Sequence, residues 1–97
     1  MSEMYYEIGV GWIPLVETFL KLAEWDAQYN KTPPVQILQV KEKFGELRIY
    51  YSGGDKRTDA YVTFAMAMSK QMCEECGAPA VTSNKKGWIK TVCDEHI

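Results

Sequence analysis

Residues 35–51 read VQILQVKEKFGELRIYY, and this stretch decides the fold. Polar and apolar residues alternate on both sides of Gly45, which is the period of β-strands whose two faces differ in polarity. Because glycine adopts backbone conformations that other residues resist, Gly45 is placed to form the turn between residues 35–43 and residues 47–51. The stretch therefore predicts a β-hairpin. One face of its first strand is expected to carry Leu38, Val40 and Glu42.

A helical pattern precedes the hairpin. Apolar residues recur at steps of three and four between Leu15 and Ala23, and charged residues occupy other positions between them. Pro14 fits the first turn of a helix, where its missing N–H is not needed. The pattern predicts a helix over residues 13–28. It ends before Pro33-Pro34, since proline cannot continue the hydrogen-bond ladder.

A second helical pattern follows the hairpin, after the glycine-containing break at residues 52–55. It predicts a helix over residues 58–72 that packs on the hairpin through one apolar stripe. That stripe is expected to contain Tyr61, Phe64, Ala65, Met68 and Met72, with Val62 and Met66 at its edge.

The three cysteines and the single histidine all lie in the last quarter of the chain, in the pattern C-x2-C-x16-C-x2-H. The candidate ligands are Cys73, Cys76, Cys93 and His96. Two intervening residues allow a tight turn to direct both side chains of a pair to one ion, and Gly77 allows the backbone to turn back after the first pair. Four such ligands with no open position predict one structural Zn²⁺ per chain.

The segment between the two ligand pairs predicts a short hairpin. Residues 80–82 and 88–92 are its expected strands, and residues 83–87 are its expected turn. Folding this hairpin back on itself brings the second ligand pair to the first. An alternative is a redox pair in Cys73-x-x-Cys76, but that reading leaves Cys93 and His96 unexplained.

Together these elements predict a small α+β fold in the order helix, β-hairpin, helix and C-terminal zinc-bound hairpin, the last resembling a zinc ribbon. We expect a single domain over residues 1–97. It has an α-β-β-α core over residues 1–72 and a zinc-binding module over residues 73–97. Both helices are expected on one face of the hairpin, and a strand of the zinc-bound hairpin is a candidate to extend the small sheet.

The sequence predicts no enzymatic activity. With His96 assigned to the metal, no histidine remains as a general base. A catalytic zinc usually keeps a water position, and no Gly-x-Ser-x-Gly elbow, P-loop or dinucleotide fingerprint occurs in the sequence. Glu42 and Glu46 alternate with basic residues, so we expect ion pairs rather than a catalytic carboxylate pair. Those basic residues are Lys41, Lys43 and Arg48.

Composition and charge argue against nucleic acid and membranes as partners of this chain. The 97 residues carry a net charge of −2 and a pI of about 5.3, whereas a dedicated nucleic-acid binder normally shows a basic excess. No run approaches the roughly 18 apolar residues that span a bilayer, and the first residues do not form a signal-peptide pattern. We therefore expect no membrane partner and a cytoplasmic location, which suits clustered cysteines that bind metal.

A nucleic-acid interface on the zinc module is the alternative function. Lys85, Lys86 and Lys90 surround Trp88, and such an arrangement can stack a base while it neutralises phosphate. Acidic residues beside the ligand pairs offset this charge, and for Trp88 we favour a role in packing the zinc module against the second helix. A second candidate strip comprises Lys41, Lys43, Arg48 and Tyr50.

Three segments carry a family resemblance: GWIPL at residues 11–15, QVKEKFGELRIY at residues 39–50, and the CEECG and CDEH ligand pairs. Together they resemble a group of small bacterial and phage-borne proteins in which a QVKEKFG-LR-Y hairpin precedes a zinc-ribbon-like tail. The resemblance covers nearly the whole chain. It implies a bacterial or phage protein of the cytoplasm and supports the same four zinc ligands, and it implies no established activity.

We therefore expect a zinc-stabilised protein–protein interaction module, with a regulator or inhibitor of a host defence system as one role for it. Small size, a rigid staple, surplus aromatic residues and the lack of a catalytic set motivate this hypothesis. A homo-oligomer that pairs through a hairpin edge is a further possibility. The aromatic residues are Tyr5, Tyr6, Trp12, Trp25, Tyr29, Tyr50 and Trp88.

Overall fold

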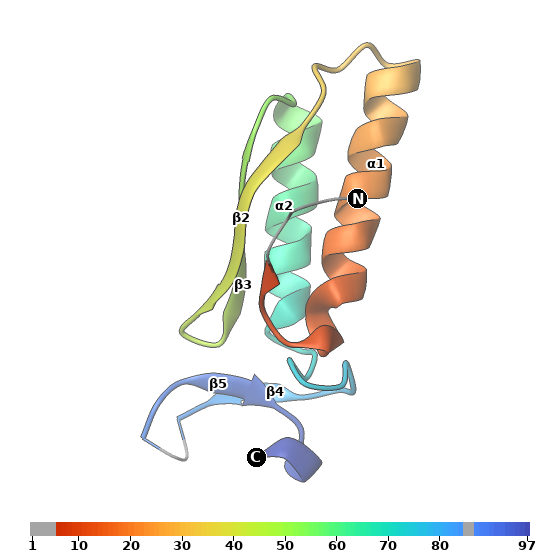
Figure 1. Cartoon of the computed structure of the whole chain (residues 1–97). Coiled ribbons are helices and arrows are strands. Elements are labelled where there is room, and N and C mark those ends of the chain that lie inside the picture. Colours follow the sequence, from red (N-terminus) through yellow and green to blue (C-terminus); the bar gives the residue numbers. More distant parts are fainter. Residues whose placement is uncertain (1–5, 85–86) are drawn as a thin grey trace.

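The computed structural model describes residues 6–84 and 87–97 and has an α+β fold (Figure 1). Two helices lie side by side on one face of a three-stranded sheet, and a second, two-stranded sheet lies at the end of the first, next to its hairpin turn (Figure 1). The predicted order of helix, hairpin, helix and C-terminal hairpin is confirmed. The elements are β1 (Tyr6–Glu7), the 3-10 helix η1 (Val10–Trp12), α1 (Ile13–Tyr29), β2 (Gln36–Lys43), β3 (Glu46–Ser52), α2 (Lys56–Ser69), β4 (Val81–Ser83), β5 (Lys90–Val92) and the 3-10 helix η2 (Asp94–His96).

The predicted central hairpin is formed by β2 and β3, which pair antiparallel around a two-residue turn. Phe44 and Gly45 occupy that turn with φ of +55° and +78°, the left-handed values that match the twist of the two strands. Glu42 stabilises the turn, since its carboxylate accepts a hydrogen bond from the Gly45 N–H at 2.8 Å. Only part of the expected ion-pair ladder forms, as Arg48 pairs with Glu46 at 3.0 Å.

The predicted face of the first strand is wrong at one position. The pairing register shifts between Ile37 and Gln39, and a bulged residue changes which side of the strand its neighbours occupy. As a result Leu38 is exposed, while Ile37 packs against the hydrophobic core beside the buried Val40. A strict two-residue period could not reveal this shift.

The sheet gains its third strand from the N-terminal side of the chain. β1 pairs in parallel with β2, with Tyr6 opposite Val40. The expected extension by a strand of the C-terminal hairpin is therefore wrong, since β4 and β5 pair only with each other. Only Tyr6 and Glu7 pair with β2, and a strand of two residues is too short to leave a periodic signal in the sequence.

The second helix begins earlier and ends earlier than predicted. Asp55 caps α2 by accepting the Arg57 N–H at 2.9 Å, while the Asp55 N–H donates to Thr58 Oγ1, which completes a capping box. Its buried positions are Thr58, Val62, Ala65 and Ser69. Phe64, expected in the buried stripe, is 68% exposed, because the stripe that faces the sheet is rotated away from it.

The hydrophobic core lies between the helices and the sheet. Leu47 and Ile49 of β3 and Val40 of β2 meet apolar side chains of both helices there. Trp12 is fully buried at the end of this core that is nearest the C-terminal module. The other buried core members are Val16, Phe19, Val62 and Ala65.

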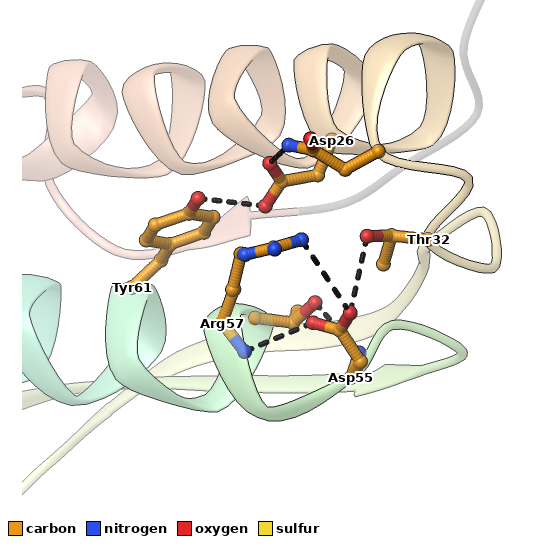
Figure 2. Close-up of polar contacts among 7 residues, drawn as sticks. Asp26, Thr32, Asp55, Arg57 and Tyr61 are labelled. Atoms are coloured by element: carbon orange, nitrogen blue, oxygen red, sulfur yellow. Dashed lines mark hydrogen bonds and ion pairs between the residues drawn. The ribbon is translucent and has the colours of Figure 1, made fainter.

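A buried polar cluster joins the end of α1 to the start of α2 (Figure 2). Asp26 as a residue is 2% exposed, and its carboxylate accepts hydrogen bonds from the Tyr61 hydroxyl at 2.6 Å and the Asn30 amide at 2.7 Å. The bond from Tyr61 lowers the pKa of Asp26 although burial acts in the opposite direction. Thr32 donates to the capping carboxylate of Asp55 at 3.1 Å. Both oxygens of Asp26 have partners, so packing of the helices accounts for this cluster.

Candidate metal centre

The structure brings all four predicted ligands together. One donor atom from each of Cys73, Cys76, Cys93 and His96 lies within 4.8 Å of every other. The first pair follows the end of α2, and the second pair follows β5 and continues into η2. The short hairpin of β4 and β5 returns the chain to the first pair, as the sequence predicts. All three cysteines are free thiols.

The spacing of these donor atoms fits a tetrahedral ion. Zinc bound to sulfur at about 2.3 Å and to nitrogen at about 2.0 Å spaces two sulfurs by roughly 3.8 Å and a sulfur and a nitrogen by roughly 3.5 Å. The sulfurs of Cys76 and Cys93 lie 3.7 Å apart. His96 Nδ1 lies 3.6 Å from the Cys73 sulfur and 3.2 Å from the Cys93 sulfur. Three thiolates and one imidazole are the ligand set of a closed zinc site.

Local backbone geometry explains why both ligand pairs converge. After the first pair, Gly77 has φ of +83° and its N–H donates to the Cys73 carbonyl at 2.8 Å, so the chain turns back as predicted. The Cys73 N–H then donates to the Ala78 carbonyl at 2.7 Å. At the second pair, the His96 N–H donates to the Cys93 carbonyl at 3.0 Å, which folds the x2 spacing into one turn of 3-10 helix.

The electrostatics of the cluster favour a thiolate at Cys73. Burial disfavours ionisation of Cys73, but the backbone N–H groups of Cys93, Cys76 and Glu75 outweigh it and lower the pKa of this thiol to about 6. At Cys76 the Ala78 N–H acts to lower the pKa, but burial and the sulfurs of Cys93 and Cys73 outweigh it, so the pKa of this thiol is raised. Hydrogen bonds with the sulfurs of Cys93 and Cys73 raise the pKa of His96. Negative charge that collects on the sulfurs therefore attracts a proton to the imidazole. A metal cation would occupy the same field and displace that proton.

The N-terminal segment holds the first ligand pair from the opposite side, a contact that sequence patterns did not predict. The Gly11 N–H donates to the Glu74 carbonyl at 2.8 Å, and the Gly9 N–H donates to the Glu74 carboxylate at 3.0 Å. The indole of Trp12 donates to the Met72 carbonyl at 2.8 Å. A Cβ on Gly11 would overlap the carbonyl oxygen of Cys73, so the close approach requires glycine there. The Gly-x-Gly-Trp spacing is the signal that marks this contact in retrospect.

The β4–β5 hairpin is fixed to the central hairpin by buried polar contacts. The Thr91 hydroxyl donates to the Gly45 carbonyl at 2.6 Å and contacts the Thr82 hydroxyl at 2.6 Å. The Thr91 carbonyl accepts the Glu74 N–H at 2.9 Å, and the buried carboxylate of Glu74 pairs with Lys90 at 3.5 Å. The ligand pairs are thus held in place by both the N-terminal segment and the central turn.

Of the four residues of the alternative nucleic-acid interface, the structure describes Trp88 and Lys90. Trp88 is 65% exposed, so the expected packing of this side chain against the second helix is wrong. It lies with Phe44, Ile89 and Lys90 around a surface hollow between the two hairpins. Lys85 and Lys86 lie outside the described residues, as does Tyr5.

Comparisons of the chain with protein-family models, with curated proteins and with solved structures gave no match. In the described part of the chain, no helix is long and apolar enough to cross a membrane.

Proposed function

We propose that this chain is a non-enzymatic recognition module whose C-terminal part is held by one structural Zn²⁺ on Cys73, Cys76, Cys93 and His96. The closed set of three thiolates and one imidazole supports a structural ion, because catalytic zinc usually keeps a ligand position for water. The two strands of the C-terminal hairpin have three residues each, and a two-stranded sheet this short is marginal without further constraint. The ion supplies that constraint.

Metal analysis of the purified protein tests whether these four residues bind one zinc ion. We expect one zinc per chain by elemental analysis, and cobalt exchange should give the visible absorption of tetrahedral thiolate coordination. Cys93→Ser and His96→Ala should lose the metal, whereas Glu95→Gln, a change between these two ligands, should keep it. Retention of one zinc per chain by the ligand variants would refute the assignment.

The exposure and backbone conformation of Phe44 support a role in recognition. This aromatic side chain is 64% exposed and holds a φ of +55°, which costs free energy for any residue with a Cβ. Hairpin turns of this kind favour Asn, Asp or Gly, so neither packing nor turn chemistry accounts for Phe44. Strain at an exposed residue indicates a role outside folding.

Phe44 belongs to an exposed apolar surface made by both hairpin tips, which we call the tip surface and define by Phe44, Trp88 and Ile89. These three side chains surround a hollow of about 510 Å³ that Glu42 and Lys90 also line. Large aromatic residues that a partner would bury are common anchors of protein–protein interfaces, so the proposed partner of this exposed surface is another protein.

Substitution of Phe44 tests its effects on stability and on partner binding separately. Phe44→Asn should raise the free energy of unfolding by about 0.5–1 kcal/mol, because Asn tolerates positive φ better than Phe. The same variant, and Trp88→Ala, should lose the proteins that the wild type captures from a bacterial lysate, with each candidate confirmed by calorimetry on purified components. Leu38→Ala removes an apolar side chain outside the tip surface and should leave capture unchanged. Unchanged capture by both tip variants would refute the proposal.

A nucleic-acid partner is the second candidate, and the uncovered face of the sheet favours it. Lys41 stands opposite Arg48 on that face, with its ammonium 5.6 Å from the ring centre of Tyr50. Anisotropy of labelled single-stranded oligonucleotides should then show salt-dependent binding that Lys41→Glu weakens and Lys70→Glu, a change on the far end of α2, does not. Lack of binding at low salt would exclude this candidate.

A further inference from the structure

A second hollow, of about 230 Å³, lies on the side of the β4–β5 hairpin that faces away from the central hairpin, where η2 also lies (Figure 1). We call it the outer hollow. Thr82 and Thr91 stand opposite each other and face the central turn, so the neighbouring positions on both strands face the other way. These positions include Ser83, Lys90 and Val92, and all three line the outer hollow. Strand alternation thus makes its first wall.

The second wall comes from the segments that carry the metal ligands. Glu75 lies between the first two ligands in the chain, and His96 and Ile97 stand at the end of the second pair. Trp88, which is 65% exposed, also lines the outer hollow, and it lines the hollow of the tip surface as well. A partner that buries Trp88 at the tip surface therefore reaches the outer hollow too.

The size and lining of the outer hollow suit one long side chain. Pockets that enclose a drug-sized ligand usually have about 300–1,000 Å³, and this hollow is smaller. Val92 and Ile97 offer aliphatic surface. Trp88 offers an aromatic face, and Glu75 offers a carboxylate. A lysine or arginine side chain has the matching form, because its apolar stem ends in a charged head.

The charges around the outer hollow favour a cation. Among the described residues that line it, Lys90 is the one lysine or arginine, and its ammonium pairs at 3.5 Å with the buried carboxylate of Glu74. Within residues 6–84 and 87–97, Glu75 forms no ion pair. Asp94 and Glu95 are exposed next to His96 in the chain. A centre of three thiolates and one Zn²⁺ is itself net negative, so it adds to the attraction for a basic group.

We infer that the outer hollow binds an arginine side chain of the protein partner. Guanidinium fits better than ammonium, because it is planar and can stack on the indole of Trp88 while it donates hydrogen bonds to the carboxylate of Glu75. A phosphate group would meet the same negative charges and be repelled. The inference rests on the proposed function for the kind of partner. The outer hollow itself contains neither Phe44 nor Ile89 of the tip surface, so it can be tested separately.

Titration of the zinc-loaded, isotope-labelled chain with N-acetyl-arginine amide tests the outer hollow directly. In NMR spectra the probe should shift the Trp88 indole N–H and the backbone amides of Glu75 and Ser83. We expect these shifts to saturate with a dissociation constant of about 1–10 mM, the weak affinity of a single side chain. N-acetyl-citrulline amide has the same length without the charge, so it should bind about 10-fold more weakly or not at all.

Substitutions at the two proposed contacts test the site. Glu75→Gln and Trp88→Ala should each weaken binding of the arginine probe by about 5-fold or more. Glu24→Gln and Trp25→Ala make the same changes at exposed residues of α1 and should leave binding unchanged. Circular dichroism and zinc content would establish that each variant is folded and metal-loaded.

Several results would overturn the inference. These are the lack of saturable shifts up to about 50 mM arginine probe, equal binding of the citrulline probe, and unchanged binding by folded Glu75→Gln. Tighter binding of guanosine monophosphate than of the arginine probe would replace it with a nucleotide site. A purified partner that bound Glu75→Gln as tightly as the wild type would also overturn it. The proposed function fails in a different way, since Phe44→Asn and Trp88→Ala would then keep the partner, while saturable binding of the arginine probe would still support the outer hollow.

Discussion

The most direct measure of how the metal module is fixed to the core is the single change Thr91→Val. Thr91 is fully buried, and its hydroxyl is the donor to the Gly45 carbonyl in the central turn. Valine has nearly the same shape, so the variant leaves no cavity and removes only the hydroxyl and its contact with Thr82. The Gly45 carbonyl then loses a buried donor, which costs about 1–3 kcal/mol.

Urea unfolding of the zinc-saturated protein measures this cost. With an m-value of roughly 1–1.5 kcal/mol/M for a small domain, the midpoint of Thr91→Val should fall by about 1–2 M. Thr63→Val makes the same chemical change at an exposed position of α2 and should stay within about 0.5 kcal/mol of the wild type. If Thr91→Val lost no more stability than Thr63→Val, the hydroxyl would not join the two hairpins, and the proposed fixing of the module would be refuted.

Three further outcomes are expected. Gly11→Ala should destabilise the chain by about 3 kcal/mol or more, because its Cβ overlaps backbone atoms that cannot rotate away, whereas Val10→Ala should be nearly neutral; thermal melts of both variants check this. Because the pKa of Asp26 is lowered in the folded chain, the stability that its carboxylate contributes is complete above pH of about 4 and is lost as the pH falls below that value. The difference in urea midpoint between wild type and Asp26→Asn should therefore shrink from about pH 6 to about pH 3. Zinc affinity, measured by competition with a chelator, should fall as the pH falls, because protons compete for the same thiolates and imidazole.

Local patterns predicted the parts of the fold that local physics determines. The central hairpin follows from alternation around a glycine, and the four ligands follow from two x2 spacings that a tight turn imposes. Both depend on residues close in the chain. The error at Leu38 arose because a bulge shifts the register by one residue, and alternation alone carries no record of such a shift.

Local sequence patterns did not predict the contacts between segments that are distant in the chain. β1 joins the sheet only because the N-terminal segment passes β2, and Gly9 and Gly11 approach Glu74 across more than sixty residues of chain. The exposure of Phe64 could not be predicted either, because it depends on where the sheet packs against α2. The apolar spacing on α2 predicted one wide stripe that included Phe64, and only the position of the sheet decides which part of it is buried.

The proposed zinc ion and the proposed recognition function are linked, because the tip surface takes residues from both hairpins. Phe44 comes from the central hairpin, whose core contacts do not involve the metal, whereas Trp88 comes from the hairpin between the ligand pairs. Removal of zinc should loosen the β4–β5 hairpin and separate Trp88 from Phe44, since three-residue strands and the polar contacts of Thr91 cannot hold the hairpin alone. Chelation should therefore abolish capture of the protein partner. A chelated chain that kept full partner binding would show that recognition does not require both tips.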